Sequence, residues 1–575
     1  MSGSTYNVSA PRVFIDVYPY EGGQFTVSGN SAAFISMSTS KHIMNGGSGQ
    51  FTLNLAPGGP YGLNSRPTWM DIFTPFSLVV IGMQRATHVA VVMVGLVVST
   101  EEVQNRSFNG VQRAIRVNGE DFTRIFNAFC YYNLNLQLGI PQGPFGLFGM
   151  PTTISGAAQG TPAKVGSVWY NQIMNSPSLL GSTAFAYRGS RPTFFDLMAT
   201  WFEAYPANID IPTIAPFLAD EGTWLNKFLT FFPFPWYEFF IQTAPVGYYG
   251  SATSPNTQAS VTISSSGGEL NIDETITAAP IGITTANTPI VMNGYPPVSP
   301  TLVARVNPLP FLGASGNSGS PTYSVDLSKW NALPVFGMDG GHGTIGQTLG
   351  YSDVEVRNYY VFAPTWLLTS FGQSNGSITP FQLLFTSWVD QASIHRYGFR
   401  PNNAEVRWMA DSGIFAQSQA ASGNSSSAFQ QLAATLSLRP VSYYEPTPNM
   451  LRGAVRMELR PDILPGNTFT FVPYRDGVKW TFYIEGVSHS VPFGSVATTE
   501  LTLTRGLRTE DYSNSALMTA LLTGNAQRIN GQLQIGLPEG IGQPLIPVNL
   551  DTIQGVVFGL SQSFNAPRGN SASGP

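Results

Sequence analysis

Charged side chains are scarce in this chain, since Asp, Glu, Lys and Arg make up only 11% of its 575 residues. Globular proteins typically carry about 25%. Disorder does not explain the scarcity, because hydrophobic residues reach 43% and aromatic residues 12%, enough to build several cores. A folded chain with so little charge gives much of its surface to neighbouring chains. We therefore expect a subunit of a large assembly.

Clusters of basic residues are also missing, and the net charge at pH 7 is −5. Tight binding of nucleic acid depends on lysines and arginines that gather to neutralise phosphates. The sequence therefore argues against a dedicated DNA-binding module. The sequence is still compatible with a protein that forms the wall of a channel through which DNA slides.

Cysteine occurs once, at Cys130, which excludes internal disulfides and cysteine-built zinc sites. Cys130 lies among Phe126, Phe129 and Tyr131, so we expect a buried thiol rather than a nucleophile.

A hydrophobic run long enough to span a membrane is not found. The most apolar segment, residues 77–99, is interrupted by Gln84, Arg85 and His88. The interruption leaves two runs of strand length, which predicts a β-hairpin and no membrane span. The first residues, 1–5, contain neither a basic region nor an apolar core, so we expect no secretory signal.

Motifs for catalysis or cofactor binding are absent or weak. Gly341, Gly343 and Gly346 spell G-x-G-x-x-G, but a further glycine precedes them and a polar stretch follows, which indicates a loop. Asp339 and His342 have no second cluster nearby, so a solvated turn is favoured over a metal site. The five histidines lie outside known catalytic motifs. We expect no enzyme, no cofactor and no metal.

Alternating strands near the C-terminus are the strongest positive signal. Apolar residues alternate with polar ones in four segments between Gly453 and Gly506. Pro461, Pro465 and Gly466 end the first segment and mark a turn. The pattern predicts a four-strand antiparallel meander that curls into a small barrel. Its expected inward residues are Val455, Met457, Leu459, Phe469, Phe471, Trp480, Phe482, Ile484, Leu501 and Leu503.

An earlier region, residues 50–117, has the same alternation of apolar and polar residues, which predicts a first barrel. Residues 118–121 supply a turn and an N-cap for a following helix. The helix is indicated by apolar residues at helical spacing, at Phe122, Ile125, Phe126 and Phe129. The strands are expected at 51–55, 78–83, 89–98 and 111–117.

The region between the two barrels has a different pattern. Aromatic stripes predict helices over 194–205 and 224–229, where a packed core is favoured over a ligand cavity. A strand is expected at 236–241. The stretch 250–271 is rich in Ser, Thr, Gly and Asn, which predicts a long outer loop.

Further helices are expected nearer the C-terminus. Apolar spacing predicts them at 381–388, 429–436 and 517–522, and Gly524 ends the last one. From there to Pro575 the chain is rich in Gly, Pro, Asn and Gln, which indicates an extended arm that needs a partner.

A family resemblance rests on three motifs that follow one another closely. They are Arg-Pro-Asp-x-x-x-Gly, Tyr-x-Glu-x-Val-x-His-Ser and Leu-Thr-Arg-Gly. Together with 351–358 and 396–400 upstream, they resemble the last tube-type barrel of baseplate hub proteins from contractile-tailed bacteriophages. The resemblance covers roughly residues 300–510, with a looser echo near the N-terminus. The residues that carry it are Arg460, Pro461, Asp462, Gly466, Tyr483, Glu485, Val487, His489, Leu503, Thr504, Arg505 and Gly506.

The resemblance implies a mainly β fold with α elements, an α+β multi-domain protein with two tube-type antiparallel β-barrels and an inserted α+β domain. We expect five segments. They are 1–138 (first barrel and following helix), 139–300 (inserted α+β domain), 301–440 (β and helical hub domain), 441–510 (second barrel) and 511–575 (C-terminal helix and extended arm).

The resemblance also implies a structural role in the virion, at the phage tail baseplate, for a protein made in the host cytoplasm. Three chains with two barrels each present six quasi-equivalent barrels, which match a trimeric spike to a hexameric tail tube. The hub links the two, nucleates the tube and forms part of the DNA exit channel. The implied partners are its own copies in a homotrimer, the tail spike protein, the tail tube protein or a tube initiator, baseplate wedge or neighbouring tail proteins, and DNA in transit.

Two alternatives stay open. A tail-associated cell-wall hydrolase needs a catalytic constellation within 140–300, and zymography on peptidoglycan detects it. A receptor-binding tail protein suits the aromatic, glycine-rich composition, and binding to host cells detects it. The same sequence features also fit the hub of a phage-derived contractile device, because such a hub has the same packing and symmetry as a phage hub.

Overall fold

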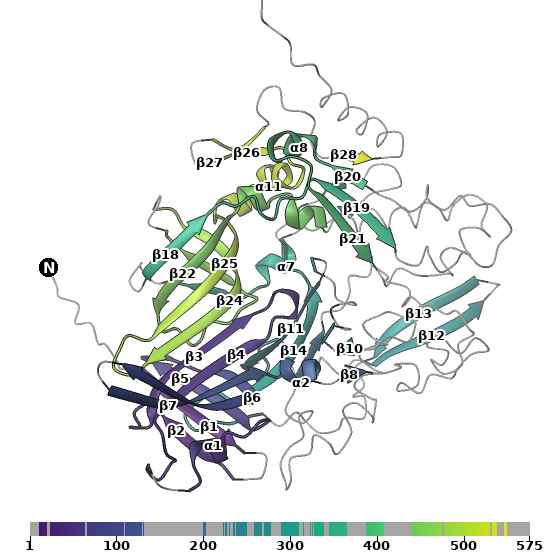
Figure 1. The fold of residues 1–575 in the computed structure, drawn as a ribbon. Helices are drawn as coiled ribbons and strands as arrows, with labels where there is room; N and C mark the ends of the chain where they lie inside the picture. The colour runs from purple at the N-terminus through teal and green to yellow at the C-terminus, as the bar shows by residue number, and fades with distance from the viewer. Residues whose placement is uncertain are drawn as a thin grey trace, which may run out of the picture.

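The structure is a computed structural model that describes the two ends of the chain more fully than its middle. Its architecture is mainly β with few helices, as the sequence predicts (Figure 1). The described residues are 11–19, 23–63, 66–107, 110–128, 130–131, 199–202, 222–223, 225–226, 229, 234–235, 237–249, 258–266, 269–277, 289–309, 314–315, 322–323, 325, 327–338, 344–364, 387–406, 440–473, 477–529, 532–536 and 546–548.

One curled sheet of 13 strands dominates the molecule (Figure 1). Its order is β18-β22-β25-β24-β3-β4-β7-β6-β5-β1-β2, with β23 beside β24 and β17 beside β23. The strands are β1 (Arg12–Tyr18), β2 (Phe25–Ser28), β3 (Phe34–His42), β4 (Gly49–Leu55), β5 (Leu78–Arg85), β6 (His88–Ser107), β7 (Gly110–Asp121), β17 (Val335–Gly337), β18 (Thr344–Gly350), β22 (Leu451–Glu458), β23 (Thr468–Phe471), β24 (Trp480–Pro492) and β25 (Thr498–Arg508).

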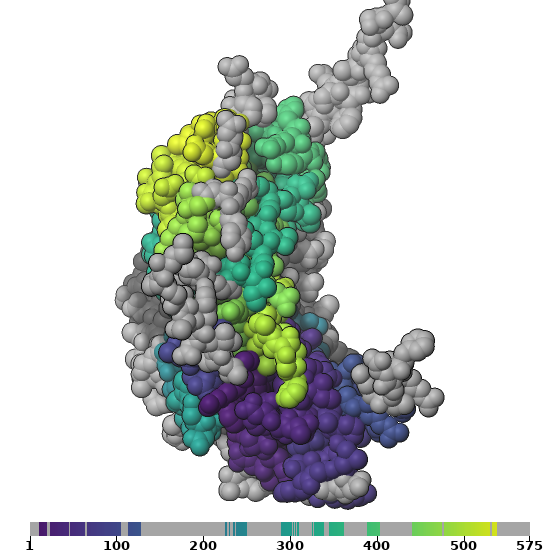
Figure 2. All heavy atoms as spheres, turned by 90° about the vertical axis from the view of Figure 1, so that its left-hand side faces the viewer, coloured from purple at the N-terminus to yellow at the C-terminus, as the bar shows by residue number. Residues whose placement is uncertain are grey.

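Strand β24 joins the two regions that carry barrel patterns. Its first part pairs with β23, where Thr468 lies opposite Tyr483. Its last part pairs with β3, where Ser488 lies opposite Ser40. Figure 2 shows the yellow-green C-terminal strands directly against the purple N-terminal ones. The two regions are therefore lobes of one continuous sheet.

One pairing in the C-terminal meander differs from the prediction. Strands β23, β24 and β25 follow one another as expected, but β22 pairs with β25, with Ala454 opposite Thr502. The connection from Leu459 to Gly466, which holds two prolines, carries the chain across the lobe instead of into a hairpin.

Each lobe has its own hydrophobic core. All ten residues that the sequence places inward in the C-terminal meander are buried. Nine belong to the core of the second lobe, while Leu459 packs in the first. The alternation fails on the opposite face, because Thr468 and Thr470 on β23 and Thr481, Tyr483 and Glu485 on β24 are buried as well. A second layer covers that face.

The covering layer is a small sheet of β11 (Tyr237–Pro245), β14 (Val298–Val306) and β9 (Ala199–Phe202). The strand expected at 236–241 is confirmed in β11. The helix expected at 194–205 is wrong over Ala199–Phe202, which pairs in parallel with β14. Leu225, Asn226 and Leu229 are helical as expected.

The outer loop expected at 250–271 is wrong over 258–266 and 269–271, and the rest of that range lies outside the described residues. Strands β12 (Gln258–Ser266) and β13 (Glu269–Thr277) form an antiparallel hairpin, with Ile263 opposite Ile272. Val261, Ile263 and Ile272 alternate with polar residues along these two strands. The two-residue period of a strand was therefore present, although the polar composition suggested a loop.

A third sheet has the order β21-β19-β20-β28, from β19 (Tyr359–Pro364), β20 (Ser387–Val389), β21 (Pro401–Val406) and β28 (Ile546–Val548). The helix expected at 381–388 is therefore wrong at Trp388, which lies in β20 and is fully buried. Strand β28 comes from the expected C-terminal arm and pairs with β20 of the same chain.

The helices are short. The one expected at 517–522 is confirmed, since Asn514 accepts a hydrogen bond from Leu517 N at 3.2 Å and Gly524 follows with φ +69°. Strand β7 runs through Asp121, so residues 118–121 are not the expected turn, although Asp121 Oδ1 accepts from Thr123 N at 2.9 Å. The helices are α1 (Trp69–Ile72), α2 (Thr123–Ala128), α7 (Ser328–Asn331), α8 (Gln391–Tyr397), α11 (Ser515–Leu522), η1 (Met44–Gly46), η4 (Thr447–Asn449) and η5 (Asp511–Ser513).

The remaining strands form two-stranded pairs. They are β8 (Cys130–Tyr131) with β10 (Gly222–Thr223), β15 (Ala314–Ser315) with β16 (Thr322–Tyr323), and β26 (Ala526–Ile529) with β27 (Gln532–Ile535).

Other expectations have a mixed outcome. The apolar segment 77–99 forms the hairpin of β5 and β6, as expected, and within the described ranges no helix has the length and hydropathy of a membrane span. Gly346 lies in a strand. Asp339, Gly341, His342, Gly343 and the helix expected at 429–436 lie outside the described residues.

Candidate functional site: the buried joint between lobes and second layer

The motif residue Tyr483 binds the second lobe to the sheet that covers it. Its hydroxyl donates to Glu238 Oε1 at 2.6 Å and accepts from Arg305 Nη2 at 2.9 Å. All three side chains are buried. Glu238 stands on β11 and Arg305 on β14, so three strands from two sheets meet at one phenol.

Arg305 extends this network to the turn that begins with the Arg-Pro-Asp motif. Its Nε donates to Glu238 Oε2 at 2.9 Å and its Nη2 donates to Gly466 O at 2.6 Å. Gly466 has φ +81°, and a Cβ there would lie 2.9 Å from Arg305 Nη2. Glycine is therefore required both by the backbone and by the close approach of the guanidinium.

The Thr-Arg-Gly segment of β25 adds a second buried guanidinium. Arg505 lies over the Tyr483 ring at 4.1 Å from its centroid, and its Nη1 donates to Pro308 O at 3.1 Å. Its φ of +56° is unusual for a residue with a side chain, so the surrounding contacts must hold it. A Cβ on the next residue, Gly506, would lie 2.2 Å from Phe482 Cε1.

The ionisable groups of this joint are buried, and both guanidiniums approach the Glu238 carboxylate. Burial, followed by the Glu238 carboxylate, raises the pKa of Tyr483 well above its ordinary value, so the phenol stays a donor. Burial also raises the pKa of the motif residue Glu485, although Arg505 acts in the opposite direction. Removing either Glu238 or Arg305 leaves the buried charge of the other uncompensated, which is strongly destabilising.

Arg460 and Asp462 form a second, less buried joint with the first lobe. The guanidinium binds the carboxylate in a fork, Nε to Oδ1 at 2.9 Å and Nη2 to Oδ2 at 2.8 Å. Burial acts to raise the pKa of Asp462, but the hydrogen bonds and charge of Arg460 outweigh it and lower the pKa. His88, next to the turn between β5 and β6, reaches the same carboxylate at 3.3 Å, and Arg85 pairs with Glu458.

His489 is a buried residue of the motif. Its Nδ1 lies 2.9 Å from Thr499 Oγ1, and Thr499 Oγ1 also accepts from Arg460 N at 2.8 Å. Burial lowers the pKa of His489 to about 4, so the ring is neutral near pH 7. The remaining motif residues are buried too: Pro461, Val487, Leu503 and Thr504.

The two upstream motif segments also meet in space. Asn358, which is fully buried, donates from Nδ2 to Gly398 O at 2.7 Å and accepts from Arg400 N at 2.7 Å. Arg400 Nη2 pairs with Asp353 Oδ2 at 2.9 Å. One asparagine thus holds 351–358 against 396–400.

Two residues of the main joint, Glu238 and Arg305, are not among those predicted from the sequence. Their signal was present, because Glu238 interrupts the apolar run 236–241 and Arg305 stands between Ala304 and Val306. A charged residue within a strand that is otherwise apolar has to find a buried partner.

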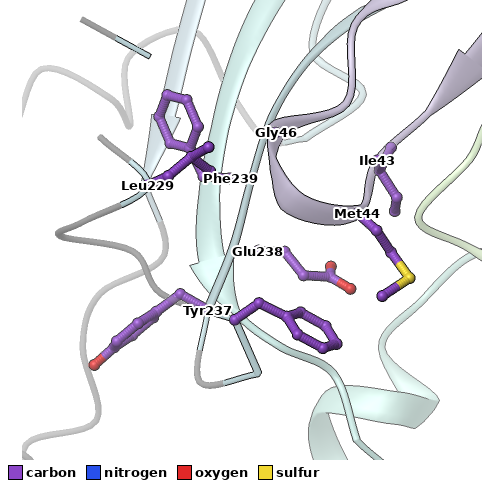
Figure 3. A pocket seen from close by; sticks show the side chains of 8 residues that line it. Ile43, Met44, Gly46, Leu229, Tyr237, Glu238 and Phe239 are labelled. Atoms are coloured by element: carbon purple, nitrogen blue, oxygen red, sulfur yellow. The ribbon is translucent and has the colours of Figure 1, made fainter. Parts of the chain in front are cut away.

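A small cavity lies beside Glu238 (Figure 3). Its volume is about 60 Å³, which suits water rather than a substrate. Across the described part of the chain, no three His, Cys, Asp or Glu side chains gather to hold a metal. The site is therefore a joint, with the chemistry of packing and buried hydrogen bonds. The cavity is lined by Ile43, Met44, Gly46, Leu229, Phe234, Tyr237, Glu238 and Phe239.

Comparison with known proteins gives weak similarities only. No protein-family profile and no curated protein matches the chain. Among solved structures, a tail protein from Neisseria meningitidis MC58 has a TM-score of 0.39 and 11% identity, over 86% of this chain and 96% of that one. A 43 kDa tail protein of prophage MuSo2 from Shewanella oneidensis has 0.37 and 10%, over 86% and 98%. Prophage tail protein gp18 from Listeria monocytogenes EGD-e has 0.35 and 8%, over 87% and 98%. At this level of similarity, function has to be argued from the chain's own residues.

Proposed function

We propose that this chain is a structural protein of a phage tail baseplate, and that within the baseplate it is the hub between spike and tube. The observation that carries the proposal is the continuous sheet, in which β24 belongs to both lobes. A hub has to transmit force without hinging between its two tube-type lobes. A strand shared by both lobes, with the buried ion pair of Arg305 and Glu238 behind it, supports that mechanical role.

Symmetry supports the same proposal. Each chain offers two β lobes with separate cores, so three copies in a ring offer six. Six lobes match a hexameric tail tube on one side, and three chains match a trimeric spike on the other. The low charge of the chain fits a subunit whose surface is largely covered by neighbours.

The polar face of the sheet suits a channel past which DNA moves. Small hydroxyl and amide side chains cross the seam of the two lobes, and Arg456 lies opposite Glu500, which cancels both charges. A channel wall without clustered lysines and arginines does not bind the phosphates of DNA tightly, so DNA can slide past it. The exposed or half-exposed residues of this face include Ser36, Ser38, Ser40, Gln50, Asn54, Ser488, Ser490 and Thr502.

Light scattering of the purified chain tests the assembly. We expect a mass of about three times 62.0 kDa, or a mixture of monomer and trimer if the spike is needed to hold the ring. A stable dimer or tetramer contradicts the six-lobe match. Adding tube protein to the trimer should shorten the lag of tube growth, and electron micrographs should show the trimer at one tube end.

The alternatives are tested in parallel. Zymography on peptidoglycan should show no clearing zone, and labelled protein should not bind host cells. A reproducible clearing zone favours the hydrolase, and saturable binding to cells favours the receptor-binding protein.

A further inference from the structure

Two acidic side chains are buried together away from the main joint. Asp390 follows β20 and caps α8, where its Oδ1 accepts from Ser393 N at 3.0 Å. Glu445 belongs to the segment before β22. Their exposed fractions are 2% and 8%. Burial of two carboxyl groups side by side calls for some form of charge compensation.

The hydrogen bonds around this pair show what compensates the charge. Tyr360 Oη donates to Arg357 O at 2.6 Å and to Glu445 Oε2 at 3.2 Å, so its single hydrogen is shared between two acceptors. The carboxyl groups of Glu445 and Asp390 lie beside one another, since a Cβ on Gly524 would touch both Glu445 Oε1 and Asp390 Oδ2. Two carboxylates repel one another, so this contact needs one proton between them.

Three parts of the chain converge on the pair. A Cβ on Gly524, just after α11, would lie 2.9 Å from Glu445 Oε1 and 3.1 Å from Asp390 Oδ2. Asp390 N donates to Asn358 O at 3.0 Å, which ties the pair to the upstream motif segment 351–358. The end of α11, the start of α8 and the segment before β22 are therefore packed around this acid pair.

We propose that Asp390 and Glu445 form a proton-dependent latch, which holds these three parts together while the proton is shared and loosens them when it is lost. The titratable groups that face Glu445 are Asp390, Tyr360 from β19 and Tyr397 from α8. Tyr444 stands next to Tyr360. No cation acts on Glu445 among the residues that the structure describes.

The direction of the pH dependence follows from this environment. Burial, and then the neighbouring Asp390, raises the pKa of Glu445 well above its ordinary value. The folded state therefore keeps a proton that the unfolded state releases, so this contribution to stability is full at low pH. It is lost as pH rises through the raised pKa of Glu445.

Thermal unfolding and hydrogen exchange at about pH 5 and about pH 9 test the latch, since buried carboxyl groups can titrate between those values. From the lower to the higher pH, we expect Tm to fall by several degrees. Protection of α8 and of 441–450 should fall with it, after correction for the pH dependence of exchange itself. Glu445→Gln removes the charge and can still donate a hydrogen bond, so it should lose most of this pH dependence.

A second variant and a control make the result decisive. Asp390→Asn keeps the cap on α8 and breaks up the acid pair, so it should also flatten the pH profile. Glu510→Gln changes a glutamate whose side chain is 70% exposed and should follow the wild type. If both latch variants follow the wild type at both pH values, the proposal is wrong. If Glu445→Gln does not fold, the profile of Asp390→Asn decides alone.

Discussion

Tyr483 is one phenol that connects three strands of the chain. Its hydroxyl group satisfies Glu238 and Arg305 at once, and its ring carries the guanidinium of Arg505. A buried polar group of this kind contributes less by its own bonds than by the charges it would leave unsatisfied.

Tyr483→Phe tests this statement. We expect a loss of about 1–3 kcal/mol of unfolding free energy, because Glu238 and Arg305 each lose a buried partner. Chemical denaturation measures it. The matched control is Tyr61→Phe, at a side chain that is 74% exposed, and it should change little. Equal effects of the two variants contradict the role of the phenol.

Gly506 makes a second test at the residue scale. A Cβ there would overlap Phe482 Cε1 at 2.2 Å and approach Leu451 O at 2.8 Å. Gly506→Ala should therefore cost about 1–3 kcal/mol through overpacking. Gly346→Ala is the control, since nothing lies within 4 Å of its added Cβ. A neutral Gly506→Ala in denaturation would mean that the lobe adapts freely around this strand.

At the scale of elements, the two faces of β24 pack against different parts of the molecule. Phe482 and Ile484 face the core of the second lobe, while Tyr483 belongs to a cluster with residues of the covering layer. Alternation in the sequence identified the core face correctly. It assigned the other face to solvent, because nothing in a local pattern tells whether a second sheet lies behind a strand.

Phe482→Ala tests the register of β24. We expect a loss of about 3–5 kcal/mol, because the variant leaves a cavity in the second core. Thr481→Ala should cost only about 1 kcal/mol, from its lost contact with Thr509 Oγ1 at 2.9 Å. Thermal unfolding compares the two, and equal losses would place the strand one residue out of register.

At the scale of the whole molecule, the C-terminal region is partly folded onto its own chain. Strand β28 adds to β20, next to the acid pair of Asp390 and Glu445. The sequence favoured an arm that waits for a partner, because apolar residues there are interrupted by prolines and glycines. A three-residue strand at the edge of a sheet is too short to show in such a pattern.

Two deletions separate these interpretations. Removing residues 540–575 takes β28 away and should lower hydrogen-exchange protection in β20, while both lobes stay folded. Removing 549–575 keeps β28 and should leave β20 protected. If both deletions leave β20 unchanged, the pairing of β28 contributes nothing to that sheet. Attachment of a tail partner by the remaining arm stays a prediction, to be measured by assembly of tails from the two deletions.

The sequence by itself determined the mainly β class, the inward face of the second lobe, the hairpin of β5 and β6 and the helix α11, because side-chain periodicity and turn residues act locally. Only the tertiary structure decided that one sheet joins the lobes, that β22 pairs with β25, and that Glu238 and Arg305 complete the joint with Tyr483. These contacts link residues far apart in the chain, Glu238 and Tyr483 being separated by 245 positions. A local pattern shows that a charge is buried, whereas the fold determines which partner compensates it.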